Sequence, residues 1–214
     1  MPTRFIHTAD WQLGKPFASV EDESRRSLLQ KARLDALGRI ARLVVEHEAS
    51  FVVVAGDLFD SPHADKRTVS AACAAIGAMK VPVYAIPGNH DHGGPSSLWT
   101  QPFFNNERVA LAPNFRPLLG PEPVSRPDAL LLPCPLGRRH EMTDPTQWVQ
   151  GIPNVLWEAH ARVPRILLAH GSVQDFTTLP AAAGWADPDA PEESSSANRI
   201  HLDRLPAREL DYIA

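Results

Sequence analysis

The sequence predicts an α/β protein, because short apolar segments alternate with longer amphipathic ones and polar side chains follow the apolar segments. Residues 4–86 have the pattern of strand, helix, strand, helix and strand, with the helices at 24–48 and 65–79. Strands joined through helices pair in parallel through right-handed crossovers. The 214 residues are enough for one large domain, and no internal boundary or repeat is evident, so residues 1–214 are treated as a single domain.

The two helices follow from the spacing of their apolar residues. In the first, Leu34, Leu37 and Val44 fall on one helical stripe, and either Asp22 or Ser24 can cap its start. The second is rich in alanine and carries its own apolar stripe. Each helix therefore has one face to bury against a sheet.

The second half of the chain has shorter elements separated by proline and glycine. We expect a short helix at 96–105, followed by β-like pieces at 108–112, 116–119 and 129–132. A helix at 145–162 and a strand at 165–169 come next. The chain then has a helical turn at 202–209 and a final strand at 211–214. The β-like pieces are expected to form a second, partly antiparallel sheet. Residues 180–198 are rich in Pro, Ala, Asp, Glu and Ser, which predicts a mobile surface loop.

Composition excludes several classes of protein. The net charge of −4 does not indicate a strongly basic nucleic-acid binder, so any contact with DNA would need a local patch or bound metal ions. Cys73 and Cys134 match no metal-binding spacing and are expected to be buried thiols. No signal-peptide segment or membrane-length apolar run is present, so a cytoplasmic protein without a membrane contact is expected.

Each of four predicted strands ends at a side chain of the kind that binds metal ions. In chain order these are Asp10, then Asp57 after Gly56, then the run Gly88-Asn89-His90-Asp91, and finally His170. The carboxyl ends of strands in open α/β sheets meet at one edge, where such folds bind their ligands. A mixture of oxygen donors and imidazole suits Mn²⁺, Fe²⁺ or Zn²⁺, and two such ions can clamp a phosphodiester.

Each of these residues also has a purely structural explanation when it is taken alone. Asp10 would serve as a turn or helix cap, and the run at 88–91 would serve as a tight turn with capping side chains. The repetition of the pattern after four strands is what favours a metal site.

The order of these motifs resembles that of the calcineurin-like metallophosphoesterases. Residues 7–14, His-Thr-Ala-Asp-Trp-Gln-Leu-Gly, and residues 56–60, Gly-Asp-Leu-Phe-Asp, are similar to the Mre11/SbcD-type DNA repair exonucleases in particular. The resemblance implies a four-layer α-β-β-α sandwich of two mixed sheets. It also implies two divalent metal ions, with Mn²⁺ expected first and Fe²⁺, Zn²⁺ or Mg²⁺ as alternatives.

The resemblance implies a ligand set for each ion. One ion would be held by Asp10, Gln12 and Asp57, and the other by Asp57, Asn89 and His170. Gln12 stands where the family usually has histidine. Because an amide oxygen is a weaker donor than imidazole for a transition metal, the ion at Asp10 and Gln12 is expected to bind less tightly than its neighbour.

The resemblance also implies two catalytic residues. His90 would stabilise the transition state or protonate the leaving oxygen, and Asp91 would orient the His90 ring. The family places a Gly-His-x-His-type motif, with one ligand for each ion, directly after the strand at 211–214. The printed sequence contains no such motif, so the fold is expected to be truncated and incomplete at the C-terminus.

The function implied is metal-dependent phosphodiester hydrolysis of DNA, by an exonuclease or endonuclease subunit in double-strand-break repair. Its partners would be DNA, a Rad50/SbcC-type ATPase subunit that binds through segments absent from this sequence, and a second copy in a homodimer. Two alternatives stay open: a small-molecule phosphodiesterase or nucleotide pyrophosphatase of the same superfamily, and a non-catalytic scaffold that lacks ligands.

Overall fold

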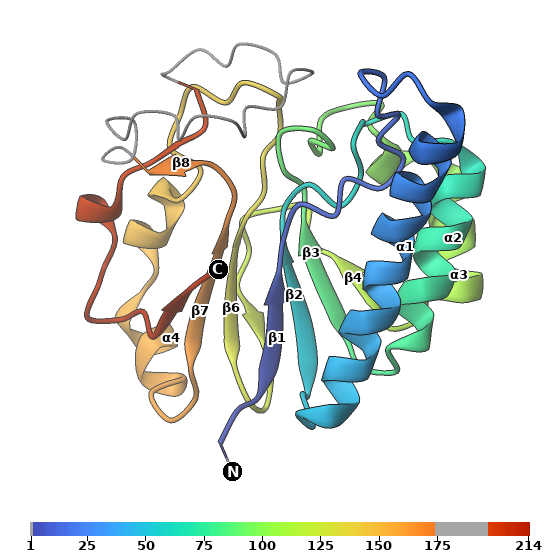
Figure 1. The fold of residues 1–214 in the computed structure, drawn as a ribbon. Helices are drawn as coiled ribbons and strands as arrows, with labels where there is room; N and C mark the ends of the chain where they lie inside the picture. The colour runs from blue at the N-terminus through green and yellow to red at the C-terminus, as the bar shows by residue number, and fades with distance from the viewer. Residues whose placement is uncertain (1, 174–196) are drawn as a thin grey trace, which may run out of the picture.

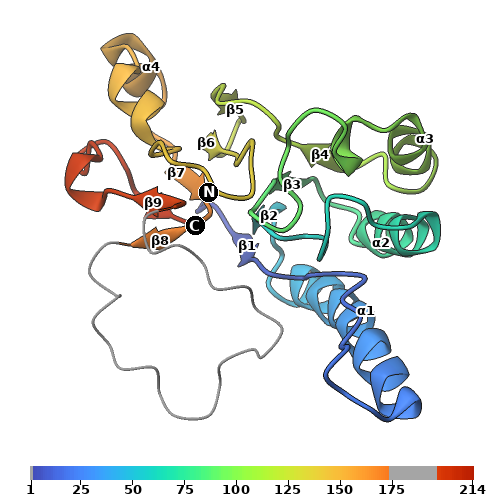
Figure 2. The same cartoon turned by 90° about the horizontal axis from the view of Figure 1, so that it is seen from above.

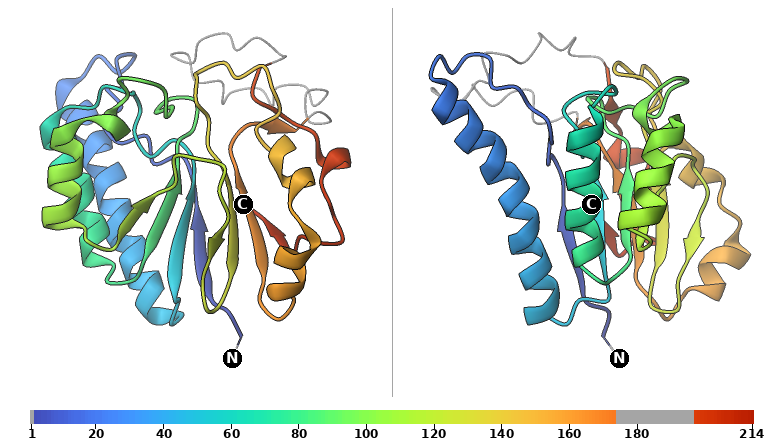
Figure 3. Two further views of the ribbon diagram at one scale, coloured as in Figure 1. Left: turned by 180° about the vertical axis from the view of Figure 1, so that it is seen from behind. Right: turned by 90° about the vertical axis from the view of Figure 1, so that its right-hand side faces the viewer.

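Two β-sheets pack face to face, and helices cover their outer faces. A computed structural model describes residues 2–173 and 197–214 of the chain. Helices α1 (Glu23–Glu46), α2 (Lys66–Ala78) and α3 (Pro102–Leu111) cover one outer face, and α4 (Asn154–Ala159) lies over the other (Figures 1 and 2). The view from behind in Figure 3 shows the same layers. The α/β fold predicted from the sequence is confirmed.

The first sheet is wholly parallel. It contains β1 (Phe5–Thr8), β2 (Phe51–Ala55), β3 (Val83–Ile86) and β4 (Phe115–Pro117) in the order β1-β2-β3-β4. Because every strand runs in the same direction, the loops that follow β1, β2 and β3 leave from one edge of the sheet. This edge carries the side chains that the sequence singles out.

The helices on the first sheet begin at side-chain caps. The carboxylate of Asp22 accepts a hydrogen bond from the backbone N–H of Arg25 at the start of α1, and Asp65 accepts one from Thr68 at the start of α2. Val52 and Val54 of β2 point toward these helices and join a core that includes Leu37. Of the two candidate caps for α1, Asp22 is therefore the one used.

The second sheet is mixed. It contains β10 (Tyr212–Ile213), β7 (Arg165–Ala169), β6 (Leu130–Cys134) and β5 (Val124–Ser125) in that order, and the β5–β6 pair alone is antiparallel among them. The 3₁₀ helix η2 (Gln147–Gly151) and α4 cover its outer face and share a core with Leu132 and Leu167. A small parallel pair, β8 (Ser172–Val173) and β9 (Arg199–Ile200), follows β7.

The inner faces of the two sheets form a separate core. Alternate residues of the central strands supply it: Phe51, Val53, Tyr84 and Ile86 from the first sheet, and Ala129, Leu131, Ile166 and Leu168 from the second. The two-residue period of a strand thus sends one set of side chains to the helices and the other to the facing sheet. This core sets the separation of the two sheets, and with it the separation of the loops above them.

Several expectations about the second half of the chain were wrong in detail. Residues 108–112, expected as a strand, belong to the end of α3 and its cap. The strand expected at 116–119 is β4, which pairs in parallel with β3 in the first sheet rather than forming part of the second. The helix expected at 145–162 is split into η2, which ends at Gly151, and α4, whose N-cap position is Pro153.

Other expectations agree with the structure. The final strand at 211–214 is present as β10, and the turn at 202–209 contains the short 3₁₀ helix η4 (Leu202–Arg204). The helix expected at 96–105 corresponds to the 3₁₀ helix η1 (Leu98–Thr100) followed by α3. The mobile loop expected at 180–198 lies outside the described residues except for Ala197 and Asn198, which are both buried.

We expect the core between the sheets to be sensitive to lost volume. Leu131→Ala should lower the free energy of unfolding by about 2–4 kcal/mol, because it leaves a cavity at a fully buried position. Leu28→Ala is the matched control, since Leu28 is 67% exposed on α1, and it should change stability by less than about 0.5 kcal/mol. Denaturant unfolding of both variants tests this, and equal effects would contradict the assigned core.

Candidate metal centre

Four loops from two sheets bring polar side chains to one place. Asp10 follows β1, Asp57 follows β2, Asn89 follows β3, and His170 follows β7. The loops after β1 and β2 are joined by backbone hydrogen bonds, from the Asp10 N–H to the Gly56 carbonyl (3.2 Å) and from the Gln12 N–H to the Asp57 carbonyl (2.8 Å). The strand-end pattern in the sequence therefore does converge in space.

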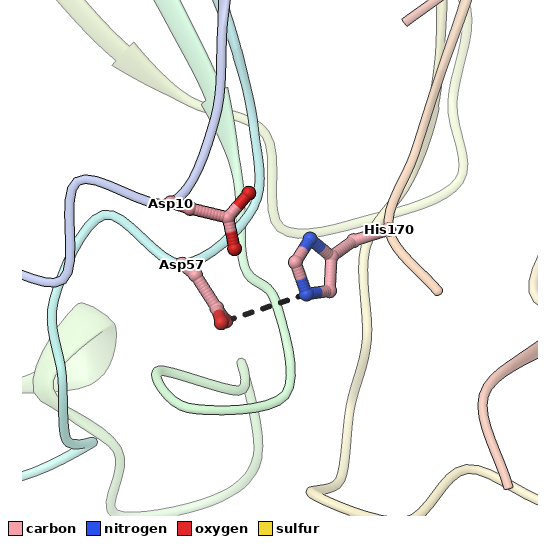
Figure 4. A group of neighbouring side chains, drawn as sticks. All are labelled: Asp10, Asp57 and His170. Atoms are coloured by element: carbon pink, nitrogen blue, oxygen red, sulfur yellow. Dashed lines mark ion pairs between the residues drawn. The ribbon is translucent and has the colours of Figure 1, made fainter. Parts of the chain in front are cut away.

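The side chains of Asp10, Asp57 and His170 point toward one another (Figure 4). Each offers one ligand atom, and these three atoms lie within 4.8 Å of one another. His170 Nε2 is 3.6 Å from Asp57 Oδ1 and 2.8 Å from Asn89 Oδ1. The four residues together offer a donor set of two carboxylates, one amide and one imidazole.

A hydrogen bond on the far side of the ring fixes the tautomer of His170. Its Nδ1 lies 2.9 Å from the carbonyl oxygen of Ala55, which can only accept, so Nδ1 carries the proton. In the neutral ring Nε2 then presents its lone pair to the oxygens of Asp57 and Asn89. Lone pairs that converge in this way are stabilised by a cation between them, so the residues present fit a divalent ion.

Two glycines permit this close approach. A Cβ atom on Gly56 would lie 2.3 Å from His170 Nδ1, and one on Gly88 would lie 2.1 Å from Asp57 Oδ1. Gly56 also has a φ of +95°, and Asp10 and Asp57 have φ values of 55° and 53°. Left-handed backbone at non-glycine residues is costly and is often found at functional sites.

Burial and like charge disfavour negative charge at Asp10 in the absence of a cation. Burial raises the pKa of the Asp10 carboxyl and the neighbouring Asp57 adds to the rise, while His170, His90 and Arg33 oppose it. A divalent ion would reverse this balance, because it stabilises the ionised form. At any pH at which Asp10 is still protonated, metal binding should therefore release a proton from its carboxyl group.

His90 lies beside this group and is oriented by Asp60. The backbone N–H of His90 donates to Asp57 Oδ1 (2.9 Å), while His90 Nδ1 lies 3.2 Å from the carbonyl oxygen of Asp60 and 3.8 Å from its Oδ1. The charge of His90 also opposes the rise in the pKa of Asp60 that burial causes. Asp60 has no role in the sequence-based assignment, although the spacing Gly-Asp-x-x-Asp contains it.

Asp91 does not orient His90, which corrects the sequence-based expectation. Its two carboxylate oxygens accept hydrogen bonds from the backbone N–H groups of Phe59 (3.0 Å) and Gly88 (2.8 Å). Asp91 is fully buried, and burial raises its pKa to about 7 despite these two bonds. Asp91 thus ties the loop after β2 to the loop after β3.

The side chain of Gln12 contacts two cationic side chains and does not join the four metal-binding candidates. Its Oε1 lies 3.4 Å from Lys15 Nζ and 3.5 Å from Arg33 Nη2, so the oxygen faces two cations. Among the residues expected to bind metal, Asp10, Asp57, Asn89 and His170 come together and Gln12 is engaged elsewhere. A cavity of about 420 Å³ is lined by three of the four, Asp10, Asn89 and His170, and also by His7 and Asn198.

The fold and the donor set define a class of protein, the metal-dependent hydrolases built on an α/β sandwich. The chain belongs to the calcineurin-like phosphoesterase family, whose model matches residues 3–204. Members of this family hydrolyse phosphoesters and bind divalent metal ions.

Two solved structures illustrate the similarity. TT1561 of Thermus thermophilus is 16% identical, with 84% of this chain and 72% of that chain covered and a TM-score of 0.49. The nuclease MPE of Pseudomonas putida is 17% identical, with 77% and 60% covered and a TM-score of 0.34. In the described part of the chain, no helix combines the length and apolar character needed to cross a membrane.

Asp91→Ala should destabilise the fold. It removes the acceptor of two buried N–H groups, and each unsatisfied donor costs about 1–3 kcal/mol, so a loss of about 2–5 kcal/mol is expected. Asp203→Ala, at an exposed aspartate in η4, is the matched control. Thermal or denaturant unfolding measures both, and an unchanged stability for Asp91→Ala would contradict its structural role.

Affinity for Mn²⁺ should fall as the pH falls. Because the pKa of Asp10 is raised, its proton competes with the ion at higher pH than for an ordinary aspartate. Below that pKa the affinity should drop by up to about tenfold per pH unit for each proton displaced. Calorimetric titration with Mn²⁺ tests this. Asp10→Asn should bind more weakly and with a flatter pH dependence, and an identical slope in this variant would contradict the role of Asp10.

Proposed function

We propose that the chain hydrolyses phosphodiester bonds in DNA with the help of a bound divalent ion, with Mn²⁺ as the expected metal. The observation that carries this proposal is the convergence of Asp10, Asp57, Asn89 and His170, with His90 beside them. When bound, the ion would supply Lewis acidity to a phosphate oxygen and lower the pKa of a water molecule.

The protein residues have separate tasks in this proposal. Asp10, Asp57, Asn89 and His170 would hold the ion, and the hydrogen bond from His170 Nδ1 to the Ala55 carbonyl keeps Nε2 facing the other donors. His90 is the candidate general acid for the leaving oxygen, since its backbone is bonded to Asp57 beside the donor group and histidine is the side chain that most often transfers protons in catalysis.

The position of Asp60 supports this role for His90. The contact with Asp60 keeps a proton on Nδ1 of His90 and turns Nε2 of the same ring away from Asp60. Nε2 of His90 is then the nitrogen available to the substrate. Asp60 is therefore a positioning residue that acts through His90.

Two observations support a DNA substrate, the first from the sequence and the second from nearby basic side chains. Residues 7–14 and 56–60 resemble the Mre11/SbcD-type exonucleases, and both segments form part of the site. The second observation is that His63 and Arg139 lie near enough to His92, two residues after His90, for their charges to act on it. A group of basic side chains of this kind suits contact with a phosphate backbone.

A Rad50/SbcC-type ATPase subunit and a second copy of the chain are the protein partners proposed on the same resemblance. Co-purification with such an ATPase, and the molar mass in solution, test these two partners separately from the reaction.

The reaction is tested by incubating the chain and Mn²⁺ with a DNA duplex that has free ends, alongside a panel of cyclic nucleotides and nucleotide diphosphate esters. Release of nucleotides from the duplex, with little turnover of the panel, is the expected result. Preferential turnover of the panel would favour a small-molecule phosphodiesterase or pyrophosphatase. Absence of all turnover would favour a non-catalytic scaffold.

His90→Ala should reduce the rate of DNA hydrolysis by about 100- to 10,000-fold, which is the usual contribution of a general acid to the rate. Mn²⁺ binding should be largely kept. His47→Ala is the matched control, because His47 is an exposed residue at the C-terminal end of α1. Rates and Mn²⁺ affinity are measured for both variants. An unchanged rate in His90→Ala would remove His90 from the mechanism.

A further inference from the structure

Two cations lie beside the metal centre, at Gln12, and do not belong to the four-residue donor set. Lys15 lies in the loop after β1, and Arg33 lies on α1. Both approach the side-chain oxygen of Gln12, at 3.4 Å from Lys15 Nζ and 3.5 Å from Arg33 Nη2. An oxygen that accepts from two cations presents its negative end to them, so it is poorly placed to bind a metal ion as well.

The guanidinium of Arg33 is held firmly in this position. Its Nη1 donates to the carbonyl oxygens of Trp11 (2.9 Å) and Asp10 (3.4 Å), and its Cζ lies 5.3 Å from the centroid of the Phe17 ring. Arginine stays protonated at every pH at which a protein is folded. The contacts of Arg33 therefore build a permanent positive charge into this part of the site.

The backbone fixes Gln12 beside Asp57. The Gln12 N–H donates to the Asp57 carbonyl, and the next residue, Leu13, donates to Leu58, so the two loops run in register. Gln12 has a φ of 41°, in the left-handed region that is costly for a non-glycine residue. An ion shared by Asp10, Gln12 and Asp57 would have to bind where Lys15 and Arg33 already approach.

The same charges act on the carboxylates around the site. Burial raises the pKa of Asp60, and the positive charges of His90, Lys15 and Arg33 oppose that rise. Arg33 also lies beside Asp10, since its Nη1 donates to the Asp10 carbonyl oxygen (3.4 Å). Neutralising these carboxylates is part of what a second metal ion would do.

We propose that this chain holds one divalent ion, on Asp10, Asp57, Asn89 and His170, and that Arg33 and Lys15 supply positive charge in place of a second ion. This inference rests on the proposed metal centre, and it concerns the number of ions that bind there and the groups that replace a second ion. The sequence predicts only that a second ion binds less tightly. The structure adds the two side chains that would exclude this ion.

The first experiment counts the ions without using activity. The metal-free chain is titrated with Mn²⁺ by calorimetry, and the loaded chain is studied by native mass spectrometry and electron paramagnetic resonance. We expect one tightly bound ion per chain and the spectrum of an isolated Mn²⁺. Two ions of similar affinity, or the exchange-coupled spectrum of a metal pair, would overturn the proposal.

The second experiment tests the two cations directly. In Gln12→His, a better ligand is present but Lys15 and Arg33 remain, so one tight ion is still expected. Adding Lys15→Gln and Arg33→Gln should strengthen binding of a second ion by about 10- to 100-fold, because two positive charges are removed from its neighbourhood. Unchanged second-ion affinity in this triple variant would show that the cations do not replace it.

A matched control separates local from general effects of charge. Lys31→Gln and Arg39→Gln remove the same charge from exposed positions of α1, and in the Gln12→His background they should leave second-ion affinity unchanged. A gain equal to that of the triple variant would contradict a specific role for Lys15 and Arg33.

Because Arg33 also holds the loop after β1, thermal unfolding confirms that each variant is folded. If the triple variant does not fold, Gln12→His with Lys15→Gln alone should still gain about tenfold, and no gain there would count against the proposal. Failure of the chain to cut DNA would overturn the proposed function while leaving the count of ions, and hence this inference, intact.

Discussion

The hydrogen bond between His170 Nδ1 and the Ala55 carbonyl oxygen joins the two sheets at the metal centre. Ala55 is the last residue of β2 in the first sheet, and His170 follows β7 in the second. The bond fixes the ring so that Nε2 faces Asp57, which is separated from Ala55 by Gly56 alone. Because a side chain on Gly56 would overlap the same imidazole, the donor set depends on a close and constant distance between the two sheets.

Packing between the sheets maintains that distance. Phe51, Val53 and Ile86 meet Leu131 and Leu168 in a fully buried core directly below the ligand-bearing loops. At one side the edge strands are joined as well, since His7 Nδ1 on β1 lies 3.0 Å from Tyr212 Oη on β10. The ligands are therefore carried by rigid strands, and each lies only one to three positions after the last residue of its strand. Such short connections favour a preorganised site.

The sequence predicts well which side chains come together, because a strand end is a local signal. Glycine before Asp57 and before Asn89, and apolar runs before Asp10 and His170, mark residues that later meet. The side chains that contact these residues are not marked by any local sequence pattern. Asp60 approaches His90, and Arg33 approaches Gln12, across distances in the chain that only the folded structure closes. For the same reason the sequence assigned to Asp91 a role that belongs to Asp60, because neighbours in sequence need not face each other.

The elements that were wrongly predicted also have a physical explanation. Val109 and Leu111 alternate with other residues as in a strand, yet both are exposed on α3, which starts at Pro102 and buries Phe104. The tertiary contact of Phe104 outweighs the local alternation. The placement of β4 beside β3 likewise depends on long-range pairing, which neither proline spacing nor local propensity specifies.

The number and position of bound ions can be seen directly in the anomalous difference map of a crystal of this chain grown with saturating Mn²⁺. We expect one strong peak bonded to Asp10, Asp57, Asn89 and His170, with Gln12 still facing Lys15 and Arg33. A peak bonded to Gln12, or the absence of any peak at the four strand ends, would contradict it.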